Sequence, residues 1–182
     1  MINVESDSSE SGKEIFQLIE KLFPICRSIT GNGVRETLSI IKQIIPELKI
    51  NEVKSGTKVF DWDVPKEWNI KDAYIKNSKN EKIVDFKKLN LHVLNYSTPI
   101  NCELSLKELK EHIFTSQEQP DLVPYRTSYY KENWGFCMSY NQFQSLEEGT
   151  YEVKIDSSLE NGSLTYGELF LPSHLPFAYD NN

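Results

Sequence analysis

The chain has 182 residues and a mass of 21.1 kDa, enough for one large domain or two small ones. Its hydrophobic fraction of 38% supports a packed core, and its aromatic fraction of 12% favours a strand-rich body. A net charge of -7 argues against a nucleic-acid partner, because phosphate neutralisation needs clustered Lys and Arg.

Membrane and secretion signals are absent from the printed sequence. No run approaches the ~18 apolar residues of a membrane span, so we expect no membrane partner. Residues 1–10 are acidic and serine-rich, unlike a signal peptide, and are predicted to be a disordered lead-in. Cys26, Cys102 and Cys137 are odd in number and far apart, which fits buried thiols in a reducing compartment. The sequence therefore predicts a soluble, cytoplasmic protein.

Two amphipathic helices are predicted at the front of the chain. Ser11 and Glu14 have the spacing of a capping box, and apolar residues follow at helical spacing until Pro24 ends the first helix. A turn at residues 30–33 separates this helix from a second, which Pro46 closes. We expect the helices to form an antiparallel pair that needs a third surface to cover it.

The hydrophobic period then changes to that of strands. Strands are predicted over residues 49–53, 59–62, 68–76, 82–86, 89–96, 134–138, 151–155 and 164–172. Residues 77–81 have the composition of a hairpin turn. A short helix is predicted after Ser105, where Glu108 completes a capping box, and a helical turn over 141–146. The pattern predicts a composite α+β architecture with a boundary near Gly56.

No metal site is expected from the histidines and cysteines. A catalytic zinc needs three protein ligands and an open position. His92, His112 and His174 have no second histidine at i+2 to i+5, and the cysteines lack C-x-x-C spacing. We interpret the histidines as surface or hydrogen-bonded side chains, and we expect no metal or other cofactor in this chain.

Catalytic residues are not predicted either. There is no G-x-S-x-G elbow, and the glycine-rich turn at 30–33 follows a helix and lacks the lysine of a P-loop, so it is interpreted as an interhelical turn. The paired acids Asp61/Asp63 and Glu147/Glu148 are interpreted as solvated loop carboxylates.

An aromatic stretch over residues 123–137 is the remaining candidate site. Arg126 offers a planar fork for a carboxylate, and Tyr129, Tyr130 and Trp134 could stack on a sugar or line a peptide groove. In the alternative interpretation Trp134 belongs to the core and the tyrosines brace a long loop.

Five blocks of sequence, in this order, resemble the front portion of bacterial aminopeptidase-like proteins. They are residues 23–31 (FPICRSITG), 58–68 (KVFDWDVPKEW), 123–130 (VPYRTSYY), 133–137 (NWGFC) and 166–169 (YGEL). The resemblance extends over most of residues 14–172 and implies a zinc exopeptidase-like α/β domain interrupted by an inserted β-rich, jelly-roll-like domain.

The resemblance also implies domain limits. Residues 11–56 would begin the peptidase-like domain, 57–157 would form the insertion, 158–172 would bring a strand back, and 173–182 would be a tail. In the longer relatives, zinc ligands follow the returning strand and a winged-helix-like part comes last. Residues 173–182, with His174, match none of those ligand segments, so no ligand position carries over.

Two functional hypotheses follow. In the first, the chain is the truncated N-terminal part of a zinc-dependent aminopeptidase-like hydrolase, inactive alone, whose complete relatives bind zinc and act on a peptide or a glycan-linked substrate. In the second, it is a non-catalytic module that binds a glycan, a peptide or a protein. An unpaired strand over 164–171 would also favour self-association.

Overall fold

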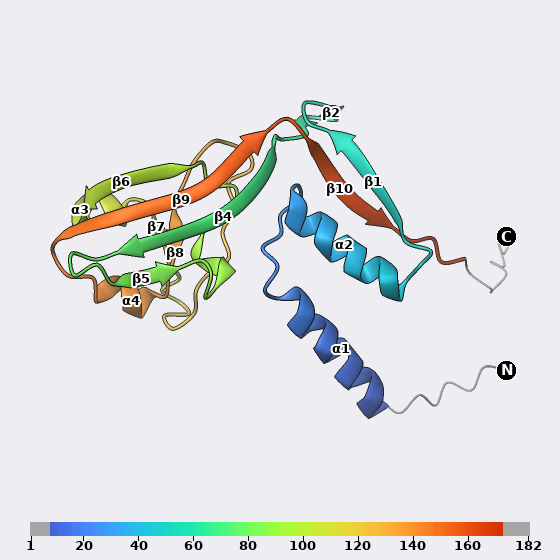
Figure 1. The fold of residues 1–182 in the computed structure, drawn as a ribbon, viewed down its shortest axis with the longest axis horizontal. Coiled ribbons are helices and arrows are strands. Elements are labelled where there is room, and N and C mark those ends of the chain that lie inside the picture. Colours follow the sequence, from blue (N-terminus) through green and yellow to red (C-terminus); the bar gives the residue numbers. More distant parts are fainter. Residues whose placement is uncertain (1–7, 173–182) are drawn as a thin grey trace, which may run out of the picture.

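The computed structural model describes residues 8–172, which form an elongated molecule with two ends (Figure 1). One end is the β1–β10 unit, made of α1 (Ser8–Leu22), α2 (Asn32–Ile44), β1 (Lys49–Lys54) and β10 (Ser163–Glu168). The other end is a β-rich body over residues 64–160. This mixture of helices and strands confirms the predicted α+β class. Within the described residues no helix combines the length and apolar character needed to cross a membrane.

The body is built around one antiparallel sheet of order β5-β4-β9-β6. Its strands are β4 (Glu67–Lys76), β5 (Lys82–Asp85), β6 (Ile100–Ser105) and β9 (Thr150–Glu160). On β9 the alternating residues Tyr151, Val153 and Ile155 are buried, as the period-2 pattern predicts. They pack into a cluster whose buried members all lie between residues 68 and 155.

Short elements complete the body. They are η1 (Asn90–His92), α3 (Leu106–Lys110), β7 (Ile113–Phe114), β8 (Phe136–Cys137) and α4 (Tyr140–Gln144). β7 and β8 form a parallel pair. A jelly roll has eight strands in two sheets. The described body has one four-stranded sheet and this pair of two-residue strands, so the jelly-roll expectation is wrong.

The two strands of the β1–β10 unit are far apart in the sequence. They pair antiparallel from Lys49 with Glu168 to Lys54 with Ser163, with residues 55–162 between them. Gly167 lets α2 pack closely against β10, because a Cβ on Gly167 would lie 2.9 Å from the Leu38 side chain of α2.

The unit joins the body at the turn that precedes α2. Thr30 is buried, forms a bridge with Leu164 of β10, and accepts a hydrogen bond from the Trp68 backbone nitrogen at 3.0 Å. Gly31 has φ 89°, and a Cβ there would collide with the Trp68 carbonyl oxygen. The predicted interhelical turn is therefore also the contact between the two ends of the molecule.

Several strand expectations differ from the structure. The strand predicted over residues 134–138 is only the two-residue β8, and β7 was not predicted. Residues 59–62 form two short strands, β2 (Lys58–Val59) and β3 (Trp62–Asp63), because Phe60 has φ 55° and reverses the chain. Residues 89–96 begin with η1 and end at Tyr96 with φ 72°, which no extended strand accommodates. β6 was not predicted, although its residues alternate between half-buried and exposed.

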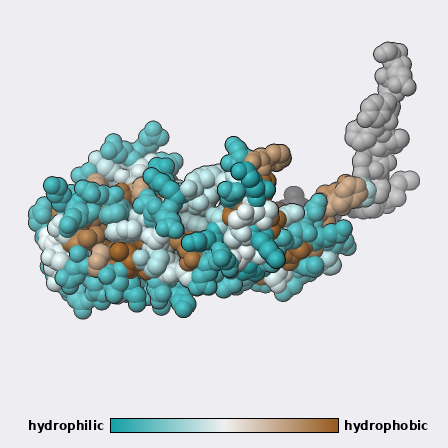
Figure 2. All heavy atoms as spheres, turned by 90° about the horizontal axis from the view of Figure 1, so that it is seen from above, coloured by the Kyte–Doolittle hydropathy of each residue, from teal (hydrophilic) through white to brown (hydrophobic). Residues whose placement is uncertain are grey.

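The front helices also differ from expectation. α1 begins at Ser8 and therefore includes part of the predicted lead-in, whereas residues 1–7 and the predicted tail at 173–182 lie outside the described residues. The apolar side chains of Ile15, Phe16 and Ile19 are exposed, so within the described residues no third surface covers α1. Hydrophobic residues also reach the surface around the β1–β10 end of the molecule (Figure 2).

Candidate functional site

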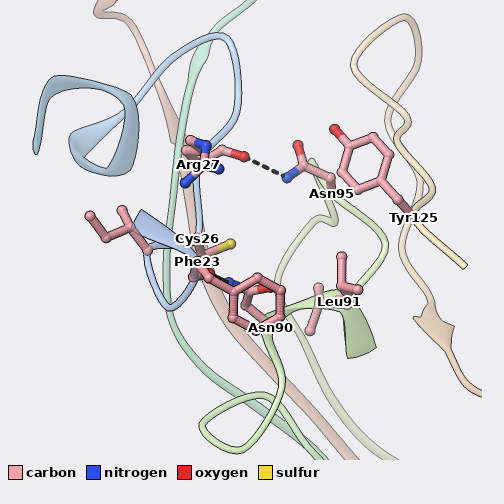
Figure 3. Close-up of a pocket in the computed structure, with 9 residues that line it drawn as sticks. Phe23, Cys26, Arg27, Asn90, Leu91, Asn95 and Tyr125 are labelled. Atoms are coloured by element: carbon pink, nitrogen blue, oxygen red, sulfur yellow. Dashed lines mark hydrogen bonds between the residues drawn. The ribbon is translucent and has the colours of Figure 1, made fainter. Parts of the chain in front are cut away.

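A pocket of about 350 Å³, called the junction pocket here, lies where the loop after α1 meets the segment around η1 (Figure 3). Its walls come from three stretches of chain that are distant in the sequence. The lining residues are Phe23, Ile25, Cys26, Arg27, Asn90, Leu91, Val93, Asn95 and Tyr125.

Most polar groups of the junction pocket hold its walls in place. Arg27 Nη1 donates to the Leu22 carbonyl at 2.7 Å and so satisfies one of the last carbonyls of α1. Asn90 Nδ2 donates to the Phe23 carbonyl at 2.9 Å, and Asn95 Nδ2 donates to the Arg27 carbonyl at 3.3 Å (Figure 3). These bonds attach the loop after α1 to the β-rich body.

The junction pocket offers few reactive groups. Burial raises the pKa of Cys26 to about 11, against the opposing charge of Arg27, so its thiol is neutral at pH 7 and a poor nucleophile. Asn95 is buried, and its Oδ1 has no hydrogen-bond partner among the described residues. The thiol in this pocket is therefore not activated for nucleophilic attack.

A second cavity of about 240 Å³, called the tyrosine pocket here, lies beside the loop that follows Thr127. It contains Tyr129 and Tyr130, two of the residues predicted to contact a ligand. The lining residues are Pro65, Lys66, Tyr96, Ser128, Tyr129, Tyr130, Lys131, Glu132 and Leu159. A hydrogen-bonding contact with Tyr130, together with burial, raises the pKa of Tyr129 above its ordinary value, so that phenol stays protonated at pH 7.

The other two predicted contact residues have different surroundings. Trp134 is half-buried, stacks on the His112 ring with centroids 3.6 Å apart, and packs against the core. Arg126 has an exposed side chain, and its carbonyl accepts a hydrogen bond from the Asn95 backbone at 2.9 Å. Neither lines the tyrosine pocket. Ligand contact by any of the four residues stays a prediction.

The described histidines and cysteines do not fit a zinc site. His92 Nδ1 lies 2.8 Å from the Cys137 carbonyl, and His112 Nδ1 lies 3.3 Å from the Trp134 carbonyl. Burial raises the pKa of Cys137 to about 12, which opposes the thiolate that zinc needs. In residues 8–172 no three His, Cys, Asp or Glu side chains are grouped to hold a metal. His174 lies outside the described residues.

The paired acids and the turn at residues 30–33 have surroundings that fit their structural interpretation. Asp61, Asp63, Glu147 and Glu148 are exposed, as expected of solvated acids. At residues 30–33 the Asn32 backbone nitrogen already donates to Asn69 Oδ1 at 2.7 Å, which satisfies one of the free amides at the start of α2.

Sequence reasoning did not find Asn95, Tyr96 or Tyr125 as pocket residues. Asn95 and Tyr96 lie in a segment predicted as a strand, and their neighbours come from non-local pairing of residues 95–97 with 127–133. The signal for Tyr125 was present, since it stands inside the block at 123–130 that resembles aminopeptidase-like proteins.

This fold is that of a peptidase-like class of proteins. A crystal structure of a protein from Clostridium acetobutylicum, provisionally named a peptidase, matches it with a TM-score of 0.84 and 64% identity, covering 88% of this chain and 38% of that one. A curated Clostridium acetobutylicum protein, provisionally named a polysaccharide biosynthesis protein with an aminopeptidase-like domain, is 62% identical over 169 residues, 93% of this chain and 39% of the relative.

The chain belongs to the family described as domain of unknown function (DUF2172), whose model matches residues 67–158. The resemblance to aminopeptidase-like proteins is thereby confirmed. The chain spans about two fifths of the length of the relatives that it matches.

Proposed function

We propose that this chain is one part of a zinc-dependent aminopeptidase-like hydrolase and is not catalytic by itself. In this proposal α2, β1 and β10 belong to the zinc exopeptidase-like α/β domain. The β-rich body, within residues 57–157, is the domain inserted into it.

The observation that carries the proposal is the pairing of β1 with β10. An inserted domain leaves its host and returns to it at neighbouring points, because the ends of a folded domain often lie close together. β1 and β10 pair over six residues each, although residues 55–162 lie between them. This is the arrangement expected if both strands belong to one host sheet.

The distribution of the core supports the same division. All buried members of the hydrophobic cluster lie within residues 68–155, and the family model matches residues 67–158. A contiguous stretch with its own core behaves as a domain.

Zinc, when bound in such a hydrolase, polarises the scissile carbonyl and activates water. The described histidines and cysteines do not fit zinc. We propose that the metal ligands come from the further part of the longer protein. The name of the curated relative, which mentions polysaccharide biosynthesis and an aminopeptidase-like domain, supports a peptide or glycan-linked substrate. The free state of Cys26, Cys102 and Cys137 supports a cytoplasmic location.

The experiment measures zinc by native mass spectrometry and the hydrolysis of aminoacyl p-nitroanilides, with this chain and the clostridial relative treated alike. We expect less than stoichiometric zinc and no turnover from this chain, and both from the relative. Stoichiometric zinc with turnover from the 182-residue chain would overturn the proposal.

A binding module that recognises a glycan, a peptide or a protein is the second candidate. The observation that favours it is the tyrosine pocket, where Tyr129 and Tyr130 lie together beside charged side chains. The two candidates are compatible, because an inserted domain can recognise the substrate of its host.

A further inference from the structure

We propose that the tyrosine pocket binds a pyranose ring that carries a carboxylate, with Tyr130 stacking on the ring and Lys131 pairing with the carboxylate. This inference rests on the second candidate above and commits it to one chemical class of ligand.

The tyrosines of the pocket are the outer members of a row of aromatic rings. Trp68 stacks on Tyr96 at 5.7 Å, Tyr96 meets Tyr129 edge-on at 5.9 Å, and Tyr129 lies 4.5 Å from Tyr130. Trp68 and Tyr96 are each 3% exposed, whereas Tyr130 is 77% exposed. The row therefore runs from the core to solvent and gives the exposed ring a rigid base.

Hydrogen bonds fix the inner part of this row. The Tyr96 hydroxyl donates to the Lys66 carbonyl at 2.9 Å and lies 2.5 Å from Thr30 Oγ1. Burial raises the pKa of Tyr96 to about 12, so its hydroxyl remains protonated at pH 7. The position of Tyr129 and Tyr130 thus depends on contacts with both ends of the molecule.

Backbone hydrogen bonds hold the loop that carries the tyrosines. The Asn95 nitrogen donates to the Arg126 carbonyl at 2.9 Å, and the Ser128 nitrogen donates to the Asn95 carbonyl at 3.0 Å. The Thr98 nitrogen donates to the Asn133 carbonyl at 2.9 Å. A loop held before binding loses less conformational entropy when a ligand arrives.

These same bonds favour a sugar over a peptide. A peptide that binds by strand addition needs unpaired backbone groups at an edge. Here several backbone groups of the loop already pair with residues 95–98. An exposed phenol ring instead offers an apolar face to the C–H face of a pyranose.

The charges at the pocket favour a carboxylate on that sugar. Lys66 and Lys131 line the pocket with Glu132, a local excess of one positive charge in a chain of net charge -7. The Lys66 Nζ lies 3.9 Å from Glu132 Oε1, so the charge of Lys66 is partly neutralised. Among the described residues Lys131 has no ion-pair partner, so its ammonium is available to a carboxylate.

The test uses saturation-transfer NMR on the full chain with methyl β-glucuronide and methyl β-glucoside as probes. We expect the glucuronide to bind more tightly than the glucoside. Tyr130→Ala should weaken binding of both sugars at least about fivefold, as expected for the loss of an aromatic contact of about 1 kcal/mol. Lys131→Ala should weaken only the glucuronide.

Two matched variants control for unrelated effects. Phe60→Ala removes an exposed aromatic ring outside both pockets, and Lys107→Ala removes an exposed lysine on α3; neither should change binding. Circular dichroism verifies that each variant is folded. The inference is overturned if neither sugar receives saturation, if Tyr130→Ala binds like wild type, or if the two sugars bind equally. These outcomes leave the zinc and hydrolysis experiment unaffected.

Discussion

Arg35 of α2 lies where four elements meet. Its Nη1 and Nη2 donate to the two Glu67 carboxylate oxygens at 2.8 and 2.6 Å, and its Nε donates to Glu52 at 2.9 Å. Glu67 also accepts from the Ser163 backbone nitrogen at 3.1 Å. α2, β1, β4 and β10 therefore meet at one half-buried group of charges, where the β1–β10 unit adjoins the body.

Removing Arg35 should destabilise this junction. We expect Arg35→Ala to lower the free energy of unfolding by about 2 kcal/mol, because it removes charge-assisted hydrogen bonds from a half-buried carboxylate. Arg35→Lys should recover only part of the loss, since one ammonium cannot reproduce the bidentate geometry. Urea denaturation measures both. Equal stability of the lysine variant and wild type would contradict the role assigned to the guanidinium.

The same pair gives a pH dependence. Hydrogen bonds from Arg35 lower the pKa of Glu67 from 4.5 to about 2. A carboxyl whose folded pKa is lowered stabilises the fold above its unfolded pKa and loses that contribution as pH falls through the folded pKa. Part of the stability should therefore disappear between pH 4.5 and about 2.

Two substitutions test whether Glu67 causes that loss of stability. We expect Glu67→Gln to reduce the slope of unfolding free energy against pH in this range, and Glu160→Gln, at an exposed carboxyl of the adjacent strand, to leave it unchanged. Urea denaturation at several pH values measures the slope. An identical slope in Glu67→Gln and wild type would show that other carboxyls cause the loss.

At the scale of elements, Gly31 determines how α2 approaches β4. Its φ of 89° and the nearby Trp68 carbonyl both exclude a side chain, whereas Gly56 has φ 80° with open space around it. We expect Gly56→Ala to cost about 1 kcal/mol from backbone strain alone, and Gly31→Ala to cost clearly more. Thermal unfolding followed by circular dichroism compares them. Equal losses would contradict the steric contact at Gly31.

The elements that local sequence signals describe well were predictable. Ser105 and Glu108 have capping-box spacing, and the structure contains both reciprocal hydrogen bonds at the start of α3. The turns at Phe60 and Tyr96 were not predictable, because both residues have positive φ and neither is a type that favours it. Non-local packing holds them in that conformation.

The candidate site was predictable only in part, for a related reason. Tyr129 and Tyr130 are adjacent in the sequence, so their aromatic character could be seen directly. Lys66 and Tyr96 reach the same pocket only in the folded chain. The Tyr96 hydroxyl donates to the Lys66 carbonyl, and residues 95–97 pair with the loop at residues 127–133 that carries the tyrosines. A single sequence does not contain that pairing.

At the scale of the whole molecule, the β-rich body should fold without the β1–β10 unit. Its buried cluster lies within residues 68–155. We expect residues 64–161 alone to unfold in one cooperative transition, followed by the fluorescence of Trp68 and Trp134. Residues 8–56 alone should show no such transition, because Leu48 is the only large apolar side chain among them that is buried even in the whole chain. A fragment 64–161 without a cooperative transition would contradict an independent body.

Exposed apolar side chains gather in the other end of the molecule. They belong to α1, to α2 and to the β1–β10 pair with the residues after it, and they include Ile15, Phe16, Ile19, Phe23, Ile44, Ile50, Tyr166, Phe170 and Leu171. Contiguous apolar surface is typical of an interaction site. This is the surface on which the proposed peptidase-like domain would continue.

The most direct test is to co-express this chain with the segment of the clostridial relative that it does not match. We expect the two polypeptides to purify together, to bind zinc, and to hydrolyse an aminoacyl p-nitroanilide, while this chain alone does neither. Zinc binding and turnover by this chain alone, or full activity of the other segment without it, would contradict the account.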